Sequence, residues 1–178
     1  MSQIFKVLLY SDGSRQSFSA AVYTAALLKK IPNMYLSIVE VQERDESHAV
    51  SDVNWRDYWF INSASEWKRI VIDDADQVVK KHSEKILHET EKIFLENEKN
   101  INYQIIYSNP SISETVEALV SYAALRSFRL IIMGTRGLTS MQGLILGCLA
   151  HNLLNKSSIP VLLVKKLPQE FIDSFCLK

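Results

Sequence analysis

Short β-rich runs alternate along the chain with longer stretches in which apolar residues recur at helical spacing. The run 5–10 is apolar and stops at the turn residues Ser11-Asp-Gly-Ser14. The stretch 16–30 repeats apolar residues every three or four positions, and a second β-rich run follows at 35–41. This part of the chain therefore predicts a strand, a helix and a second strand parallel to the first.

The same two patterns continue beyond the middle of the chain. In chain order they predict a helix from about 67 to 94, a strand over 100–107, a helix over about 111–126, a strand over 130–133, a helix from about 143 or 147 to 156, and a strand over 161–164. Five strands alternating with four helices indicate an α/β fold with an open doubly wound parallel sheet. In such sheets, ligands bind beyond the carboxyl ends of the strands.

Two segments do not fit the alternation. The pattern fails from Gln42 to about Ser65, and we interpret about 44–66 as an insertion; Trp55, Tyr58, Trp59 and Phe60 lie in it, and Trp67 follows it. Such aromatic residues either cover the core of the domain or form a lid or a protein interface. The tail 166–178 carries spaced apolar residues and is expected to dock as a short helix. No repeat or linker divides the chain, so residues 1–178 are predicted to form one domain.

Composition narrows the classes of function. The chain has 178 residues, of which 47% are hydrophobic, as expected for one globular domain. Its 20 basic and 20 acidic residues cancel, which argues against a general surface for nucleic acid or for an anionic membrane. The apolar runs are too short to span a bilayer, and the two cysteines have no metal-binding spacing. The first residues lack the features of a secretory signal, so we expect a cytoplasmic location.

The candidate chemistry lies in two loops. Gly134 and Gly137 follow the fourth strand, Gly147 precedes a helix, and bare backbone N–H groups at such a place can bind phosphate. If the first and fourth strands are neighbours, this region faces Asp12 across a crevice. Because a carboxylate repels phosphate, Asp12 is expected to accept hydrogen bonds from ribose hydroxyls or to help hold Mg²⁺. The alternatives are a simple turn carboxylate, and glycines that serve only a tight turn and close helix packing.

These segments resemble the universal stress protein (UspA) family. Its nucleotide-binding members carry Gly, two residues, Gly, nine residues, Gly and then Ser or Thr, and Gly134, Gly137 and Gly147 match this spacing. The resemblance covers residues 4–43 and 101–165, including Tyr-Ser-Asp-Gly-Ser after the first strand and Ile-Pro-Val-Leu-Leu-Val at the last. The sequence departs from the pattern at Cys148, where the family has Ser or Thr.

The resemblance implies an adenine nucleotide alpha-hydrolase-like fold, with strand order 3-2-1-4-5 and helices on both faces. It also implies ATP or another adenine nucleotide such as AMP as ligand, with Asp12 at the ribose or Mg²⁺ and the Val41 backbone at the adenine. The residues implied around the ribose and phosphates are Met133, Gly134, Arg136, Gly137, Gly147, Cys148 and Leu149. Family members often dimerise through the last strand, here Val161, Leu162, Leu163 and Val164.

Cys148 limits the expected affinity for phosphate. A thiol is a poorer donor than a hydroxyl, and the substitution is expected to weaken the phosphate contact by about 1 kcal/mol. We expect Cys148 to be a buried small residue; a redox-sensitive thiol is the alternative. His151 follows at helical spacing, which by itself does not make a catalytic pair. His82 and His88 lie on a polar helix and are expected to be exposed.

The expected function is that of a cytoplasmic, homodimeric, ATP-binding stress or signalling regulator. The sequence contains no Walker lysine and no assured general base, so any ATP hydrolysis is expected to be slow. One alternative is a scaffold or partner-binding dimer, in which Cys148 and the insertion have spoiled or blocked the pocket. Another is a true ATPase or phosphotransferase that uses Asp12.

Overall fold

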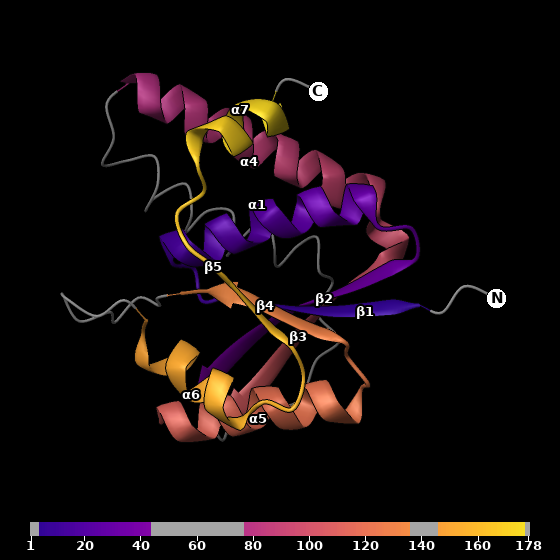
Figure 1. Ribbon diagram of the computed structural model, residues 1–178, viewed down its shortest axis with the longest axis vertical. Helices are drawn as coiled ribbons and strands as arrows, with labels where there is room; N and C mark the ends of the chain where they lie inside the picture. The colour runs from indigo at the N-terminus through magenta and orange to yellow at the C-terminus, as the bar shows by residue number, and fades with distance from the viewer. Residues whose placement is uncertain (1–3, 44–76, 136–145, 177–178) are drawn as a thin grey trace.

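The chain forms one five-stranded parallel sheet with helices on both faces (Figure 1). The computed structural model describes residues 4–43, 77–135 and 146–176. The strands lie in the order β3-β2-β1-β4-β5. They are β1 (Phe5–Tyr10), β2 (Met34–Glu43), β3 (Ile101–Ser108), β4 (Leu130–Gly134) and β5 (Val161–Val164). Both the fold class and the strand order are as predicted.

The helices form two layers. They are α1 (Arg15–Lys30), α4 (Gln77–Glu96), α5 (Ile112–Leu125), α6 (Cys148–Lys156) and α7 (Gln169–Cys176), with a 3₁₀ turn η3 (Glu98–Asn100) before β3. Figure 1 shows α1, α4 and α7 on one face of the sheet and α5 and α6 on the other. The chain therefore crosses from strand to strand over both faces, which makes the sheet doubly wound.

A separate apolar core lies on each face, because successive side chains of a strand point in opposite directions. Leu9 and Ile38 pack with Phe94 on the side of α1 and α4. Leu8 and Val39 pack with Leu119 on the side of α5 and α6. All of these side chains are fully buried, which explains why β1 and the centre of β2 are apolar at consecutive positions rather than at alternate ones.

Most predicted boundaries agree with the structure to within one or two residues. β2 runs to Glu43, so the expectation that the loop begins at Gln42 is wrong; the strand continues because its last residues still pair with β3, up to Glu43 with Ser108. The insertion proposed at about 44–66 and the first part of the helix predicted from 67 lie outside the described residues. The remainder of that helix is α4.

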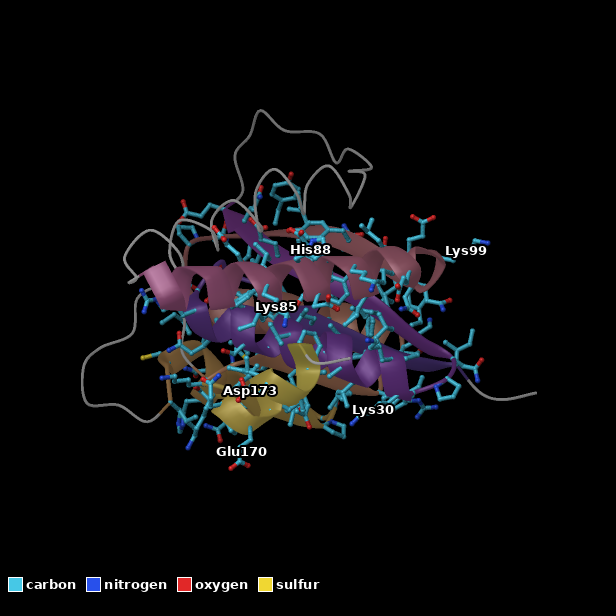
Figure 2. The ribbon with its side chains drawn as sticks, turned by 90° about the horizontal axis from the view of Figure 1, so that it is seen from above. Lys30, Lys85, His88, Lys99, Glu170 and Asp173 are labelled. Carbon is cyan, nitrogen blue, oxygen red and sulfur yellow. The ribbon has the colours of Figure 1, made fainter. Side chains whose placement is uncertain are left out.

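The tail forms the helix α7, as predicted, and packs on the face that carries α1 and α4. Figure 2 looks onto this face, with α7 beside the other two helices. The ring of Phe171 stacks on Tyr23 of α1, with centroids 5.5 Å apart, and Phe175 is buried in the core. An amphipathic segment with this aromatic content stabilises the domain by burying apolar area that α1 and α4 leave uncovered.

Candidate functional site

The candidate site lies at the carboxyl ends of β1 and β4, which are neighbours in the sheet. This confirms the condition on which the two loops were expected to meet. The backbone N–H of Ser11 donates to the Val39 carbonyl at 2.9 Å, so the chain leaves β1 still joined to β2. It then turns through Gly13, whose φ of 74° lies in the left-handed region that favours glycine. The turn leads directly into α1.

Ser14 caps α1 and thereby orients the turn. Its hydroxyl accepts from the backbone N–H of Ser17 at 3.1 Å, and its carbonyl accepts from the N–H of Phe18 at 2.9 Å. The Ser14 backbone N–H donates to Oδ1 of Asp12 at 3.0 Å. One carboxylate oxygen of Asp12 therefore has the role of a turn carboxylate, the alternative that the sequence left open.

Buried hydroxyl groups surround the backbone of Asp12. Its N–H donates to Oγ of Ser17 at 3.3 Å, and this hydroxyl donates to Oγ of Ser11 at 3.3 Å. Burial raises the pKa of Asp12 above its ordinary value of 3.8; the hydrogen bonds from Ser14 lower it, and the negative charge of Glu40 raises it further. The protein thus holds a carboxylate where its surroundings disfavour ionisation, which is common at functional sites.

Gly134, the last residue of β4, lies against the first turn of α1. A Cβ atom placed on it would lie 2.6 Å from the carbonyl carbon of Gln16 and 2.8 Å from the backbone nitrogen of Ser17. No real Cβ contact is this short, so only glycine fits without a shift of the backbone. Close helix packing therefore accounts for Gly134, and this contact fixes the distance between the end of β4 and the first turn of α1.

Backbone hydrogen bonds join the end of β4 to the start of α6. The N–H of Thr135 donates to the Val164 carbonyl at 3.0 Å, and the N–H of Gly147 donates to the Thr135 carbonyl at 2.8 Å. Gly147 is the N-cap of α6 and makes no side-chain capping bond. The amino end of α6, with its positive dipole, is thereby held beside the end of β4.

Cys148 is the first residue of α6, and its side chain is exposed. The expectation of a buried small residue is therefore wrong. In the first turn of α6 it is Ala150 that faces the core, so Cys148 lies on the outer side. The ring of His151 is also exposed, and its Nε2 lies 3.1 Å from Nδ2 of Asn155, its hydrogen-bond partner one turn further along α6.

The other predicted site residues divide into two groups. Met133 is buried, and Val41 and Leu149 are partly buried, all in the core on the side of α5 and α6. Their side chains contribute to packing. Arg136 and Gly137 lie outside the described residues. Of the two histidines expected to be exposed on a polar helix, His88 is exposed on α4 (Figure 2). The side chain of His82 is not among those that the structure describes.

The sequence did not single out a polar pair next to this edge. The hydroxyl of Tyr103 in β3 donates to Oε2 of Glu40 in β2 at 2.5 Å. Glu40 also contributes to raising the pKa values of Tyr10 and Asp12, in both cases after burial. An acidic residue between the apolar residues Val39 and Val41 was the signal that could have identified Glu40.

Within residues 4–43, 77–135 and 146–176, no group of three or more His, Cys, Asp or Glu side chains is arranged to hold a metal ion. Asp12 is thus a single carboxylate and could bind Mg²⁺ only together with ligands from elsewhere, such as phosphate oxygens. In the same part of the chain, no helix has the length and apolar character needed to cross a membrane.

The fold and the site define an open α/β protein with a polar edge at the carboxyl ends of β1 and β4, of the adenine nucleotide alpha-hydrolase-like type. The model of the universal stress protein family matches residues 4–165, and the chain belongs to this family. The matched range ends just after β5, so α7 lies outside it.

Individual relatives are distant. Universal stress protein YxiE of Bacillus subtilis is 30% identical over 94 residues, which are 53% of this chain and 60% of that protein. Universal stress protein MJ0531 of Methanocaldococcus jannaschii is 23% identical over 165 residues, covering 93% of this chain and 84% of its own length. A solved universal stress protein in complex with cAMP has a TM-score of 0.55 and 20% identity, covering 92% of this chain and 98% of its own.

Proposed function

We propose that the protein binds an adenine nucleotide, ATP in the first place, at the carboxyl ends of β1 and β4. The observation that carries this proposal is the β1–β4 pairing, because it puts the loop that carries Asp12 at the same end of the sheet as Gly134 and the amino end of α6. One side of the edge offers a carboxylate that suits ribose hydroxyls or a cation. The other offers backbone N–H groups and a helix dipole that suit phosphate.

Each predicted residue has a role in this proposal. Asp12 accepts from the ribose or shares Mg²⁺ with the phosphates, and the Val41 backbone meets the adenine. The residues around the ribose and phosphates are Met133, Gly134, Arg136, Gly137, Gly147, Cys148 and Leu149. Because Met133 and Leu149 pack into the core, their backbones rather than their side chains would face the ligand. The exposed thiol of Cys148 is accessible to a phosphate, although it is a poorer donor than a hydroxyl.

Similarity to a solved protein supports an adenine nucleotide as the ligand. That universal stress protein binds cAMP and shares the fold of this chain. ATP is favoured here because Asp12 suits a cation carried on a polyphosphate. The chain is proposed to act as a cytoplasmic stress or signalling regulator with at most slow hydrolysis, since the sequence contains no Walker lysine.

A homodimer is part of the proposal. β5 is at the end of the sheet, and three of its four residues, Val161, Leu162 and Leu163, are only partly buried. An apolar edge strand of this kind invites pairing with another chain. A second copy paired along β5 would satisfy its free backbone groups and cover these side chains.

One observation favours a second candidate function, a scaffold dimer that binds no nucleotide. The contact of Gly134 with Gln16 explains this glycine without any ligand. Equilibrium titration with ATP and Mg²⁺ separates the two functions. The nucleotide proposal predicts saturable binding at or below millimolar ligand. If no binding is seen at millimolar ligand, the scaffold dimer is the remaining candidate.

A further inference from the structure

Glu40 is placed beside the candidate crevice by the register of the sheet. Tyr10 pairs with Val39, and the Ser11 N–H donates to the Val39 carbonyl, so Glu40 lies level with the first residue after β1. Because Ile38 faces α1, the side chain of Glu40, two residues later, points to the same face. Glu40 thus lies near the carboxyl end of β2, level with the loop that follows β1, and its side chain is on the face of α1 rather than on that of α6.

Hydrogen bonds hold the carboxylate of Glu40 in one position. Tyr103, which is 5% exposed, donates its hydroxyl to Oε2 at 2.5 Å. Gln42, two residues further along β2, donates from Nε2 to Oε1 at 3.0 Å. Both oxygens accept from neutral donors, an arrangement that restricts the rotamers of the carboxylate. The carboxylate of Glu40 is therefore held in one orientation.

The charge across the crevice is asymmetric. On the β1–β2 side lie two carboxylates, those of Asp12 and Glu40, and the effect of Glu40 on the pKa values of Asp12 and Tyr10 indicates that its field reaches the end of β1. On the β4 side lies the amino end of α6, whose N-cap Gly147 makes no side-chain capping bond. An anion is repelled by the first side and attracted by the second.

We propose that Glu40, held by Tyr103 and Gln42, is a specificity-determining residue that keeps phosphate away from the β1–β2 side of the crevice. A nucleotide then presents its base and ribose to β1 and β2 and its phosphates to β4 and α6. This inference rests on the proposed nucleotide-binding function. It adds that the charge of Glu40 discriminates between ligands by their phosphate content, without itself binding phosphate or metal.

The test uses two ligands, Mg²⁺-free ATP and adenosine. The affinity of each is measured by equilibrium titration of the full chain as wild type, Glu40→Gln and Glu43→Gln. Glu43→Gln is the matched control, because it removes an exposed carboxylate from the same strand. Glu40→Gln is expected to tighten ATP binding by about three- to tenfold and to change adenosine binding by less than about twofold. Glu43→Gln is expected to change neither ligand by more than about twofold, since exposed charges are screened.

The outcomes separate the inference from the proposed function. If the wild type binds neither ligand, the proposed function fails and this inference fails with it. If the wild type binds ATP but Glu40→Gln shifts ATP and adenosine equally, or shifts neither, the inference alone is overturned. Tyr103→Phe keeps the charge and removes one of its hydrogen bonds, so its ATP-to-adenosine affinity ratio is expected to lie between those of the wild type and Glu40→Gln. A ratio that moves in the opposite direction would also overturn the inference.

Discussion

Gly134 at the end of β4 and Gln16 in the first turn of α1 lie so close that a Cβ atom on Gly134 would be 2.6 Å from the Gln16 carbonyl carbon. Because α1 follows the turn after β1, this contact holds the end of β4 against the segment that follows β1. Gly134, the first glycine of the motif proposed to bind phosphate, therefore also sets how closely α1 approaches the end of β4. Structural and ligand-binding roles of Gly134 have to be separated by experiment.

Gly134→Ala is expected to lower the free energy of unfolding by about 1 to 3 kcal/mol, because the added methyl group overlaps with backbone atoms that cannot rotate away. Urea-induced unfolding followed by circular dichroism measures this loss. An unchanged free energy of unfolding would mean that α1 can shift at no cost, and the close contact would then not determine the position of the loops.

Two serine caps offer a matched comparison. Ser14 and Ser111 are the N-caps of α1 and α5, and each hydroxyl accepts from a backbone N–H at 3.1 Å. Ser14→Ala and Ser111→Ala are each expected to cost about 1 kcal/mol of stability. Only Ser14→Ala is expected to weaken ATP binding, because the lost capping bond to Ser17 orients the turn in which the Ser14 backbone N–H donates to Asp12. Equal losses of ATP affinity in the two variants would contradict the placement of the site at β1.

The raised pKa of Asp12 predicts a pH dependence of stability. The folded state retains the proton on Asp12 at pH values where the unfolded chain has lost it, so this group makes stability fall as pH rises from 3.8 through the raised pKa. Asp12→Asn removes the effect. The variant is therefore expected to gain stability relative to the wild type at about pH 7 and to lose this advantage at about pH 4.

Chemical unfolding of both proteins at the two pH values measures this difference. A relative stability that is the same at both pH values would show that Asp12 ionises in the folded protein as it does in the unfolded chain. The same variant is expected to bind ATP with Mg²⁺ more weakly than the wild type, because an amide cannot balance the charge of the cation. Gained stability and lost affinity together are the signature of a carboxylate kept for function.

α7 is expected to stabilise the domain although it lies beyond the family match. Phe175 is buried, and Phe175→Ala should lower the free energy of unfolding by about 2 to 4 kcal/mol through the cavity it leaves. Glu170→Gln, an exposed change on the same helix, should have an effect within about 0.5 kcal/mol. If thermal unfolding showed the two variants to be equally stable, α7 would not be docked in solution.

Local patterns were sufficient to predict the elements and part of the site. β1 and its turn are visible in the sequence because an apolar run stops at Ser11, and the turn presents Asp12. The doubly wound class follows from the alternation of strands and helices. These features depend on neighbours in the sequence, which is why they were predicted without knowledge of the packing.

Features that depend on packing were not predictable in this way. Tyr103 and Glu40 are 63 residues apart and meet only through the register of β2 and β3. The exposure of Cys148 depends on where α6 begins and on which of its faces covers the sheet. The steric need for Gly134 arises from the approach of α1, which no local pattern around this glycine reveals.

The most direct test of the nucleotide site is a map of backbone amide chemical shifts during titration with ATP and Mg²⁺. We expect saturable shifts at Asp12, Thr135 and Gly147, at the carboxyl edge of the sheet. We expect none at Ser127 or Arg129, which lie at the opposite edge, before β4. Shifts confined to the opposite edge, or no shifts at millimolar nucleotide, would contradict the proposal that this protein binds an adenine nucleotide between β1 and β4.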